Sequence, residues 1–199
     1  IEKEAARYND IIIDETIEEG YFSISQKTAS IMRFGTNAVK ADYVMKCDDD
    51  TYVRLNRILL HLEALPPNQP YQYIGLISTG ALPIRDEKNK WYIPFDEFPG
   101  SVFPPFAHGP GYLLSGKLAA AVVAGLDDGS LKTLRLEDVS MGSWVAEVDK
   151  TNTVAYLRDD RFVLSGCRQD SFIGHYLKPA TMVCMFQRFI DGEMDICCA

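Results

Sequence analysis

Three consecutive aspartates are the feature of this sequence most clearly suited to chemistry. Asp48, Asp49 and Asp50 directly follow residues 42–47, a run that predicts a strand. Because side chains alternate along an extended chain, Asp48 and Asp50 should point to one side and Asp49 to the other. Carboxylates this close repel one another, and a hard divalent cation such as Mg²⁺ or Mn²⁺ would offset that repulsion. A solvated acidic turn is the alternative, and an EF-hand fits poorly because its later glycine and glutamate do not occur.

A second pair of carboxylates, Glu137 and Asp138, opens a helix predicted over 137–148. A carboxylate at this place could act as a general base and take the proton of an attacking hydroxyl group. The dipole of any helix also favours acidic residues in its first turn, so a plain helix start is the alternative.

Other candidate residues lie in the middle and late parts of the chain. His175, one of three histidines, is on a strand predicted over 172–176 and is either a metal ligand or a structural histidine. Trp91 and Tyr92 lie in a predicted loop, where they could stack on sugar rings or pack in the core. Gly109 and Gly111 either let a ligand approach the backbone closely or form a turn.

The elements that must position these residues alternate between strands and helices. Strands are predicted over 11–13, 42–47, 71–77, 111–115 and 172–176, and helices over 1–8, 25–38, 55–62, 117–124, 137–148 and 180–189. This alternation favours a parallel, doubly wound α/β sheet, in which ligands bind at the carboxyl ends of strands. The aspartates fall at such an end. Residues 78–110, rich in proline, glycine and aromatic residues, are predicted to form ordered loops and short strands around a pocket.

Composition and charge narrow the class of protein. The 199 residues correspond to one domain or most of one, and 47% hydrophobic with 24% charged residues excludes a disordered or collagen-like chain. The net charge of −8, without any block of lysine or arginine, argues against nucleic acid as a partner. No apolar run approaches the roughly 20 residues needed to span a bilayer.

The cysteines indicate the redox compartment, and the first residue indicates whether the chain is part of a longer protein. The five cysteines are Cys47, Cys167, Cys184, Cys197 and Cys198. They form no CxxC pair, which argues against structural zinc, and the four in the last third favour disulfides and an oxidising compartment. The pairing is left open. Because the chain begins with Ile1 inside a predicted helix, we expect it to be an excised portion of a longer protein.

Several blocks of this sequence occur in the order found in one enzyme family. They are residues 43–53 (YVMKCDDDTYV), 90–92 (KWY), 103–112 (with FPPF and GPGY) and 137–142 (EDV, then Gly142). Together they resemble the β-1,3-galactosyltransferase family of inverting, Golgi-resident enzymes, which use nucleotide sugars and an aspartate-x-aspartate (DxD) motif. Residues 21–28 extend the resemblance, and Gly166-Cys167, His175-Tyr176 and Cys197-Cys198 are most similar to plant-type members.

The resemblance implies an α/β fold with a GT-A-like, doubly wound mixed sheet flanked by helices. It implies that residues 1–199 are a glycosyltransferase catalytic domain, roughly its C-terminal two-thirds. The N-terminal strands that help to hold uridine, the stem and the membrane anchor would lie outside this sequence. The parent would then be a type II membrane protein with its catalytic domain in the Golgi lumen.

The resemblance also implies roles for single residues. Asp50 would ligate the metal directly, Asp48 would act beside it, and His175 would complete the metal shell. Asp138 would be the base, and Glu137 a neighbour that binds hydroxyl groups. The residues implied to contact donor or acceptor are Lys46, Asp49, Trp91, Tyr92, Gly109, Gly111 and Tyr112.

The function implied is metal-dependent, inverting transfer of galactose from UDP-galactose to the 3-hydroxyl group of a sugar acceptor. Mn²⁺ would be the cofactor, with Mg²⁺ as a substitute, and the acceptor would be a glycan on a glycoprotein or proteoglycan. One alternative keeps the fold but uses UDP-N-acetylglucosamine as donor. Another is a carbohydrate-binding module without turnover, and a third, the weakest, is a calcium-binding structural domain.

Overall fold

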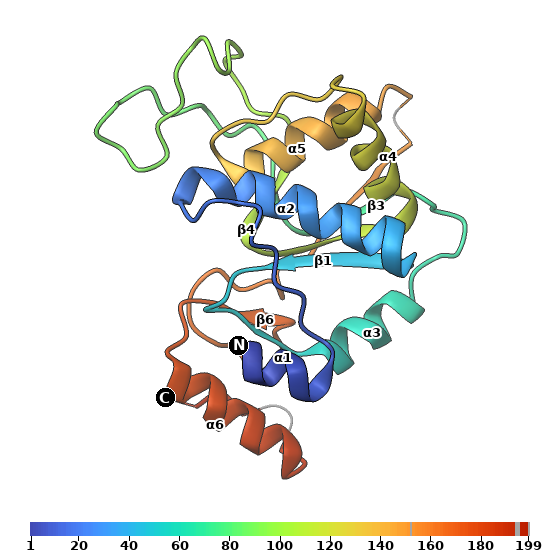
Figure 1. Cartoon of the computed structure of the whole chain (residues 1–199), viewed down its shortest axis with the longest axis vertical. Helices are drawn as coiled ribbons and strands as arrows, with labels where there is room; N and C mark the ends of the chain where they lie inside the picture. The colour runs from blue at the N-terminus through green and yellow to red at the C-terminus, as the bar shows by residue number, and fades with distance from the viewer. Residues whose placement is uncertain (152, 194–195, 199) are drawn as a thin grey trace.

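A four-stranded sheet in the order β1-β4-β3-β5 forms the centre of the molecule (Figure 1). The computed structural model describes residues 1–151, 153–193 and 196–198. The strands span Tyr43–Cys47 (β1), Phe106–Ser115 (β4), Gln72–Ser78 (β3) and Ala155–Arg158 (β5). β4 is antiparallel to β1 and β3, whereas β5 is parallel to β3. The mixed sheet with flanking helices that the resemblance implied is confirmed.

The fully parallel sheet favoured by strand–helix alternation is wrong. Between β3 and β4 the chain runs through the loop 79–105 instead of a helix that crosses the sheet. Ser78, at the end of β3, pairs with Phe106, at the start of β4. A loop that returns from the same end of the sheet gives an antiparallel pair, since a parallel neighbour requires a crossover.

Three helices cover one face of the sheet (Figure 1). They are α2 (Ile24–Arg33), which continues as the π-helix η2 (Phe34–Val39), α4 (Gly116–Asp127) and α5 (Glu137–Val148). Tyr73 of β3 and Leu114 of β4 point into the core between sheet and helices, where Met32 and Trp144 are also buried. The apolar spacing of the helices predicted this layer.

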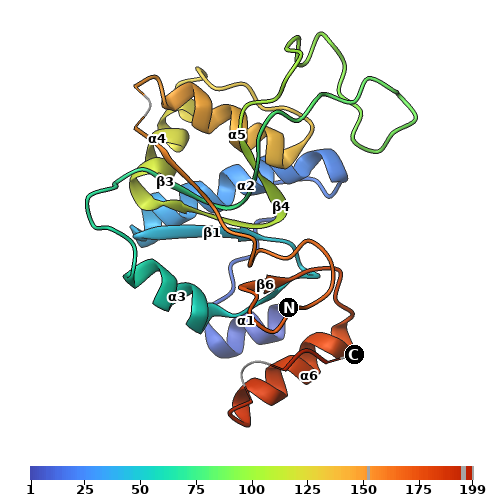
Figure 2. The same ribbon diagram turned by 180° about the vertical axis from the view of Figure 1, so that it is seen from behind.

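The opposite face is covered by α3 (Leu55–Glu63) and by a small ribbon of β2 (Tyr52–Val53) and β6 (Ile173–Gly174) (Figure 2). Ile74 and Leu113, the sequence neighbours of core residues on the first face, pack here against Ile58 and Phe172. Successive residues of a strand therefore pack into the cores on opposite faces of the sheet, because side chains alternate along a strand. The remaining helices are α1 (Glu2–Tyr8), the 3₁₀ turn η1 (Tyr21–Ser23) and α6 (Pro179–Ile190).

The strand predicted over 11–13 is wrong. These residues form no strand, and the Ile12 and Ile13 side chains are 64% and 47% exposed. A run of β-branched residues has strand propensity, but a strand also needs a neighbour to pair with. The sheet has β1 and β5 at its edges, and residues 11–13 pair with neither.

The long loop 79–105 is ordered, as its apolar composition predicted, although it projects away from the sheet (Figure 1). Ile93 and Phe103 are buried with Phe106 and with Leu136 near the start of α5. The Arg85 guanidinium donates hydrogen bonds to the carbonyl oxygens of Ile93 (2.7 Å), Phe98 (2.7 Å) and Gly100 (2.9 Å). The regular segment predicted from residue 111 begins earlier, at Phe106, as β4.

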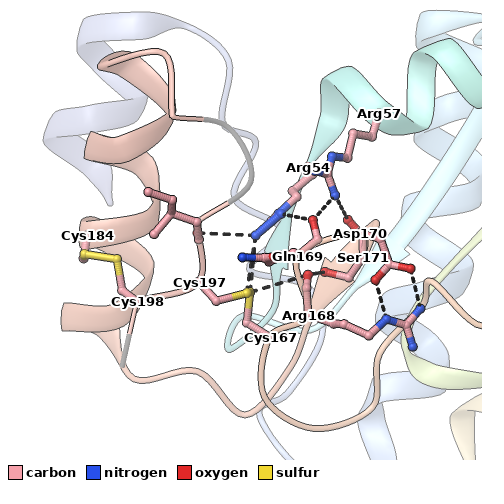
Figure 3. Close-up of a disulfide and its surroundings, with 11 residues drawn as sticks. Arg54, Arg57, Cys167, Arg168, Gln169, Asp170, Ser171, Cys184, Cys197 and Cys198 are labelled. Atoms are coloured by element: carbon pink, nitrogen blue, oxygen red, sulfur yellow. Dashed lines mark hydrogen bonds and ion pairs between the residues drawn. A yellow bond between two sulfur atoms is a disulfide. The ribbon is translucent and has the colours of Figure 1, made fainter.

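Disulfides predicted from the late cysteines are present. Cys167 is bonded to Cys197, and Cys184 in α6 is bonded to Cys198 (Figure 3). The first bond ties the C-terminal tail to the loop before β6, and the second ties it to α6. Within the described residues, no helix combines the length and the apolar character needed to cross a bilayer.

Candidate active site

The three aspartates form a turn at the end of β1. The Asp48 amide donates to the Pro110 carbonyl oxygen of β4 (3.3 Å), and the Asp50 carbonyl oxygen accepts from the Leu177 amide (3.1 Å). The turn is thus tied to β4 on one side and to the segment after β6 on the other. The side chains of Asp48 and Asp50 are partly buried, whereas Asp49 is exposed.

Asp48, Asp50 and His175 each offer one possible ligand atom, and these atoms lie within 4.8 Å of one another. His175 Nε2 is 3.2 Å from Asp50 Oδ1 and 3.7 Å from Asp48 Oδ2. Octahedral coordination with bonds of about 2.1 Å places neighbouring ligand atoms about 3 Å apart, so these atoms fit around one ion with little movement. Carboxylate oxygens suit Mg²⁺ and Mn²⁺, and three protein ligands leave positions open for substrate oxygens.

The loop before β6 holds the His175 ring. His175 Nδ1 lies 2.8 Å from the Leu164 carbonyl oxygen. This contact places the proton on Nδ1 and directs the Nε2 lone pair toward the aspartates. Gly166 fixes the backbone, because its amide donates to the His175 carbonyl oxygen (2.7 Å) and its carbonyl oxygen accepts from the His175 amide (3.1 Å).

A buried lysine links the aspartate turn to the start of α5. The Lys46 ammonium lies 2.5 Å from Asp48 Oδ1, 2.5 Å from the Gly109 carbonyl oxygen and 3.3 Å from Glu137 Oε2. Burial alone would lower the pKa of Lys46, but the carboxylates of Glu137 and Asp48 raise it above its usual value. The Lys46 ammonium therefore stays charged between Asp48 and Glu137.

Both carboxylate oxygens of Glu137 are engaged. Oε1 accepts hydrogen bonds from the hydroxyl groups of Thr28 (2.9 Å) and Tyr112 (2.5 Å), and Oε2 faces Lys46. Burial raises the pKa of Glu137, while Lys46 and the two hydroxyl groups oppose that rise. Glu137 is thus the fixed partner of Lys46, and through Lys46 it holds Asp48.

Asp138 lies beside this network and is partly exposed. Its Oδ1 accepts a hydrogen bond from the Val139 amide (2.8 Å). Burial raises the pKa of Asp138, opposed by backbone amides and by Lys46. A carboxylate with a raised pKa and an accessible edge fits a general base better than the fully engaged Glu137.

Tyr21 connects the long loop with the carboxylates. Burial raises the pKa of Tyr21, the negative charges of Asp138 and Asp48 add to this effect, and a hydrogen bond with Trp91 opposes it. Tyr21 also contacts the long loop through its ring, because the Lys90 ammonium lies 4.9 Å from the ring centroid. Trp91 is 53% exposed, so the long loop presents an aromatic surface to solvent.

Tyr92 and Phe22 share a cation beside this surface. The guanidinium carbon of Arg135 lies 5.7 Å from the centroid of the Tyr92 ring and 5.5 Å from that of Phe22. Cations over aromatic faces hold the rings in place. Through Arg135, Tyr92 connects the long loop to the segment before α5.

Gly109 and Gly111 lie within β4 and form no turn. A Cβ atom on Gly111 would lie 2.9 Å from Ile173 Cδ1 of β6, the end of a flexible side chain that can move aside. A Cβ atom on Gly109 would face Glu137 and Lys46 at ordinary contact distances. The structure brings Gly109 and Tyr112 to the same charge network, while Asp49 stays outside it.

Sequence reasoning assigned no role to several residues that the structure places at the site. Thr28 and Tyr21 lie in the block 21–28, whose resemblance to the family was the only available signal. Tyr176 has a positive φ of 56°, is 65% exposed, and its ring centroid is 3.9 Å from that of His175. Non-glycine residues with positive φ concentrate at functional sites, but no local pattern predicts them.

Comparison with known proteins gives one family. Residues 1–153 match the sequence model of the family described as Galactosyltransferase. The match includes the aspartate turn, the long loop and the Glu137-Asp138 pair, whereas His175 and the disulfide cysteines follow it.

The relatives that this chain is similar to are named as galactosyltransferases. The chain is 38% identical, over 98% of its length, to Beta-1,3-galactosyltransferase GALT1 of Arabidopsis thaliana. It is 33% identical, over 99% of its length, to Hydroxyproline O-galactosyltransferase GALT2 of the same plant. It is 37% identical, over 71% of its length, to Beta-1,3-galactosyltransferase 1 of Mus musculus. The chain spans 30%, 28% and 43% of the lengths of these relatives, respectively.

Proposed function

Because this chain belongs to the galactosyltransferase family, we propose that it carries the reaction centre of a metal-dependent, inverting galactosyltransferase that uses UDP-galactose. The observation that supports this most is the place of Asp138. It directly follows Glu137, and the Lys46 ammonium contacts both Glu137 and Asp48 of the candidate metal site. A base and a site for the leaving group are thus joined by one buried network.

The residues of the site would divide the work as follows. A divalent cation held by Asp48, Asp50 and His175 would neutralise the charge that develops on the departing diphosphate. Asp138 would take the proton of the acceptor hydroxyl group while that oxygen attacks the sugar from the face opposite the leaving group, which inverts the configuration. Glu137 and Lys46 would fix the positions of Asp138 and Asp48.

The remaining predicted contacts belong to the same proposal. Trp91 would stack on a sugar ring at the open surface, and Tyr92 would support it. Gly109 and Gly111 would keep the β4 backbone close to the donor, while Tyr112 acts through Glu137. Asp49, exposed at the turn, would contact the donor from the solvent side.

The acceptor has two candidates. The first is the 3-hydroxyl group of a sugar on a glycoprotein or proteoglycan, in keeping with the names of two relatives. The second is hydroxyproline in a peptide, because another relative is named a hydroxyproline O-galactosyltransferase. Transfer assays with a galactoside and with a hydroxyproline peptide would separate them.

Calorimetric titration of UDP, first with Mn²⁺ and then with EDTA, tests the proposal. We expect binding with Mn²⁺ and loss of binding with EDTA. Equal binding in both conditions would overturn the metal-dependent mechanism. Donor hydrolysis with UDP-galactose and UDP-N-acetylglucosamine would then identify the sugar, and glycan binding without metal or turnover would favour a carbohydrate-binding module.

For the parent protein we propose a membrane-anchored enzyme with this domain in the Golgi lumen. Two disulfides support an oxidising compartment, since such bonds are rare in the cytosol. Immunofluorescence of the tagged full-length protein with a Golgi marker would test this proposal, and cytosolic staining would contradict it.

A further inference from the structure

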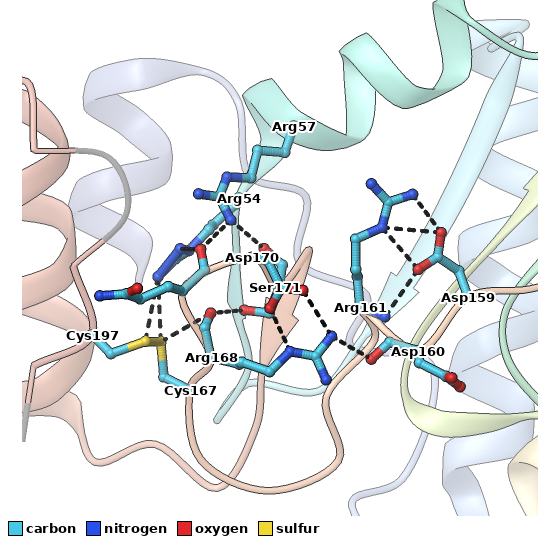
Figure 4. Close-up of polar contacts among 11 residues, drawn as sticks. Arg54, Arg57, Asp159, Asp160, Arg161, Cys167, Arg168, Asp170, Ser171 and Cys197 are labelled. Atoms are coloured by element: carbon cyan, nitrogen blue, oxygen red, sulfur yellow. Dashed lines mark hydrogen bonds and ion pairs between the residues drawn. A yellow bond between two sulfur atoms is a disulfide. The ribbon is translucent and has the colours of Figure 1, made fainter.

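The loop 159–172, between β5 and β6, supplies the contacts that orient His175. The Leu164 carbonyl oxygen faces His175 Nδ1, and Gly166 shares two backbone hydrogen bonds with His175. Two ion pairs lie within the loop, Arg161 with Asp159 and Arg168 with Asp170 (Figure 4). The loop contains no helix and only isolated bridges. The orientation of His175 therefore depends on whatever fixes this loop to the body.

Cys167, the neighbour of Gly166, anchors the loop covalently. Its partner Cys197 lies in the C-terminal tail, with the two Cα atoms 5.7 Å apart. The Arg54 guanidinium lies against this disulfide, with Nη2 at 3.3 Å from Cys167 Sγ and 3.6 Å from Cys197 Sγ (Figure 3). Its Nη1 donates to the Gln169 carbonyl oxygen of the same loop (3.0 Å). One buried arginine thus holds loop and tail together.

Arg54 is also fixed to both segments that carry the candidate metal ligands. It directly follows β2, which begins two residues after Asp50, and its amide donates to the Phe172 carbonyl oxygen (2.8 Å). β2 pairs with β6, and His175 is the residue after β6. The disulfide, Arg54 and the two ligand segments therefore form one connected unit.

We propose that the Cys167–Cys197 disulfide and Arg54 are positioning residues that fix His175 for metal binding, an inference that rests on the proposed function. Without the disulfide, residues 164–167 gain conformational freedom. The Leu164 carbonyl oxygen then no longer holds His175 Nδ1 in one place, so Nε2 turns away from the aspartates for part of the time. Metal affinity falls because the ligand is no longer preorganised.

The second disulfide provides a matched control. Cys198 follows Cys197 in the same tail, but its partner Cys184 lies in α6 instead of the His175 loop. Removing this bond takes away the same number of cysteines and the same kind of cross-link. It leaves the connection from Cys197 through Cys167 to Gly166 intact.

The test compares Mn²⁺ binding by calorimetry in three proteins: the unchanged chain, Cys167→Ser/Cys197→Ser and Cys184→Ser/Cys198→Ser. We expect the first pair of substitutions to weaken Mn²⁺ binding about tenfold or more, the scale of lost support around metal ligands. The second pair should change it less than about twofold. Equal effects of the two pairs, or unchanged binding by the folded first variant, would overturn the proposal. Circular dichroism checks folding in each case.

Arg54→Lys gives an independent measurement with both disulfides retained. Lysine keeps the charge but cannot reach the loop and both sulfurs with a planar fork, so we expect Mn²⁺ binding to weaken several-fold. Unchanged Mn²⁺ binding by Arg54→Lys would remove Arg54 from the proposal. If the double cysteine variant failed to fold, unchanged binding by Arg54→Lys would overturn the proposal as a whole. An unchanged chain that binds no Mn²⁺ would instead overturn the metal site of the proposed function.

Discussion

Asp138 and Glu137 are neighbours in sequence, yet their surroundings give them different chemistry. Glu137 is enclosed by Thr28, Tyr112 and Lys46, so its oxygens have fixed partners. Asp138 is partly exposed, and its carboxylate accepts hydrogen bonds from backbone amides, among them that of Val139 (2.8 Å). At the scale of single residues, the proposed mechanism depends on this contrast.

Asp138→Asn should abolish transfer while leaving the donor site intact. The amide keeps the shape of the side chain but cannot accept the acceptor proton, so we expect kcat to fall on the order of a thousandfold. Calorimetry should show unchanged binding of UDP with Mn²⁺. Near-normal turnover would move the base elsewhere, with Glu137 as the next candidate.

The raised pKa of Asp138 predicts a pH dependence. Burial favours the protonated form, and only the ionised form accepts a proton. The rate should therefore rise with pH through a pKa above the ordinary aspartate value of about 3.9, and be lost as pH falls below it. The measurement is kcat/KM for transfer against pH at saturating Mn²⁺, with Mn²⁺ binding followed in parallel. An acidic limb at or below the ordinary value would contradict the assignment.

The next scale is that of the elements, where the Glu137 network joins α2, β4, α5 and the end of β1. Thr28 comes from α2, Tyr112 from β4 and Lys46 from β1, and all three meet the first residue of α5. Elements far apart in the sequence are held in register by one buried carboxylate. Its partners therefore stabilise both the fold and the site.

Thr28→Val should destabilise the protein by about 1–3 kcal/mol. Valine has nearly the shape of threonine but leaves the buried Glu137 carboxylate with one hydrogen bond fewer. Urea unfolding followed by circular dichroism measures the loss. Ser30→Ala on the same helix is the control, because the Ser30 hydroxyl group donates to the exposed Asp14, and its loss should cost less than about 0.5 kcal/mol. Equal effects would contradict the role of the network.

Gly142→Ala tests the close contact between α5 and β4. A Cβ atom there would lie 2.5 Å from Phe106 Cβ and 2.7 Å from the Pro105 carbonyl oxygen. Although alanine favours helices by about 1 kcal/mol, we expect a net loss of about 1–3 kcal/mol from this overlap. Ser143→Ala, which removes a buried hydroxyl group that has no hydrogen-bond partner among the described residues, should be neutral or stabilising in the same unfolding assay. A neutral Gly142→Ala would show that the two elements can move apart.

At the scale of the whole molecule, the proposed function requires a protein with a net charge of −8 to bind an anionic nucleotide sugar. Asp48, Asp50, Glu137 and Asp138 gather at one end of the sheet, and Lys46 offsets only part of their charge. A divalent cation would therefore both bridge the donor and relieve this repulsion. Metal and donor should thus stabilise the folded state together.

We expect Mn²⁺ with UDP to raise the melting temperature of the chain, and Asp50→Ala to abolish this gain. A ligand at 100 times its Kd stabilises the state that binds it by about 2.7 kcal/mol. Differential scanning fluorimetry, with and without EDTA, measures the shift. Asp10→Ala is the control, because Asp10 is exposed and lies outside the ligand group, so this variant should keep the gain. An Asp50→Ala variant that is stabilised normally would contradict the metal assignment.

Local sequence patterns were enough to predict most helices and strands and the candidate site residues. Apolar spacing located the helices over 55–62 and 117–124, and strand–helix alternation indicated an α/β fold, because these patterns are local. Asp48–Asp50 and Glu137-Asp138 were found for the same reason, since each is a contiguous group. The block resemblance pointed to the family and to His175.

Only the tertiary structure decided how these parts meet. Strand direction depends on how the chain returns after β3, and the run 11–13 lacks a partner strand, so local propensity misjudged both. The different surroundings of Glu137 and Asp138 depend in part on Thr28, which lies 109 residues from Glu137 in sequence and donates a hydrogen bond to it. The support of His175 by Leu164 and the pairing of Cys167 with Cys197 depend on long-range contacts in the same way. Such contacts arise from packing the whole chain, and no short stretch of sequence encodes them.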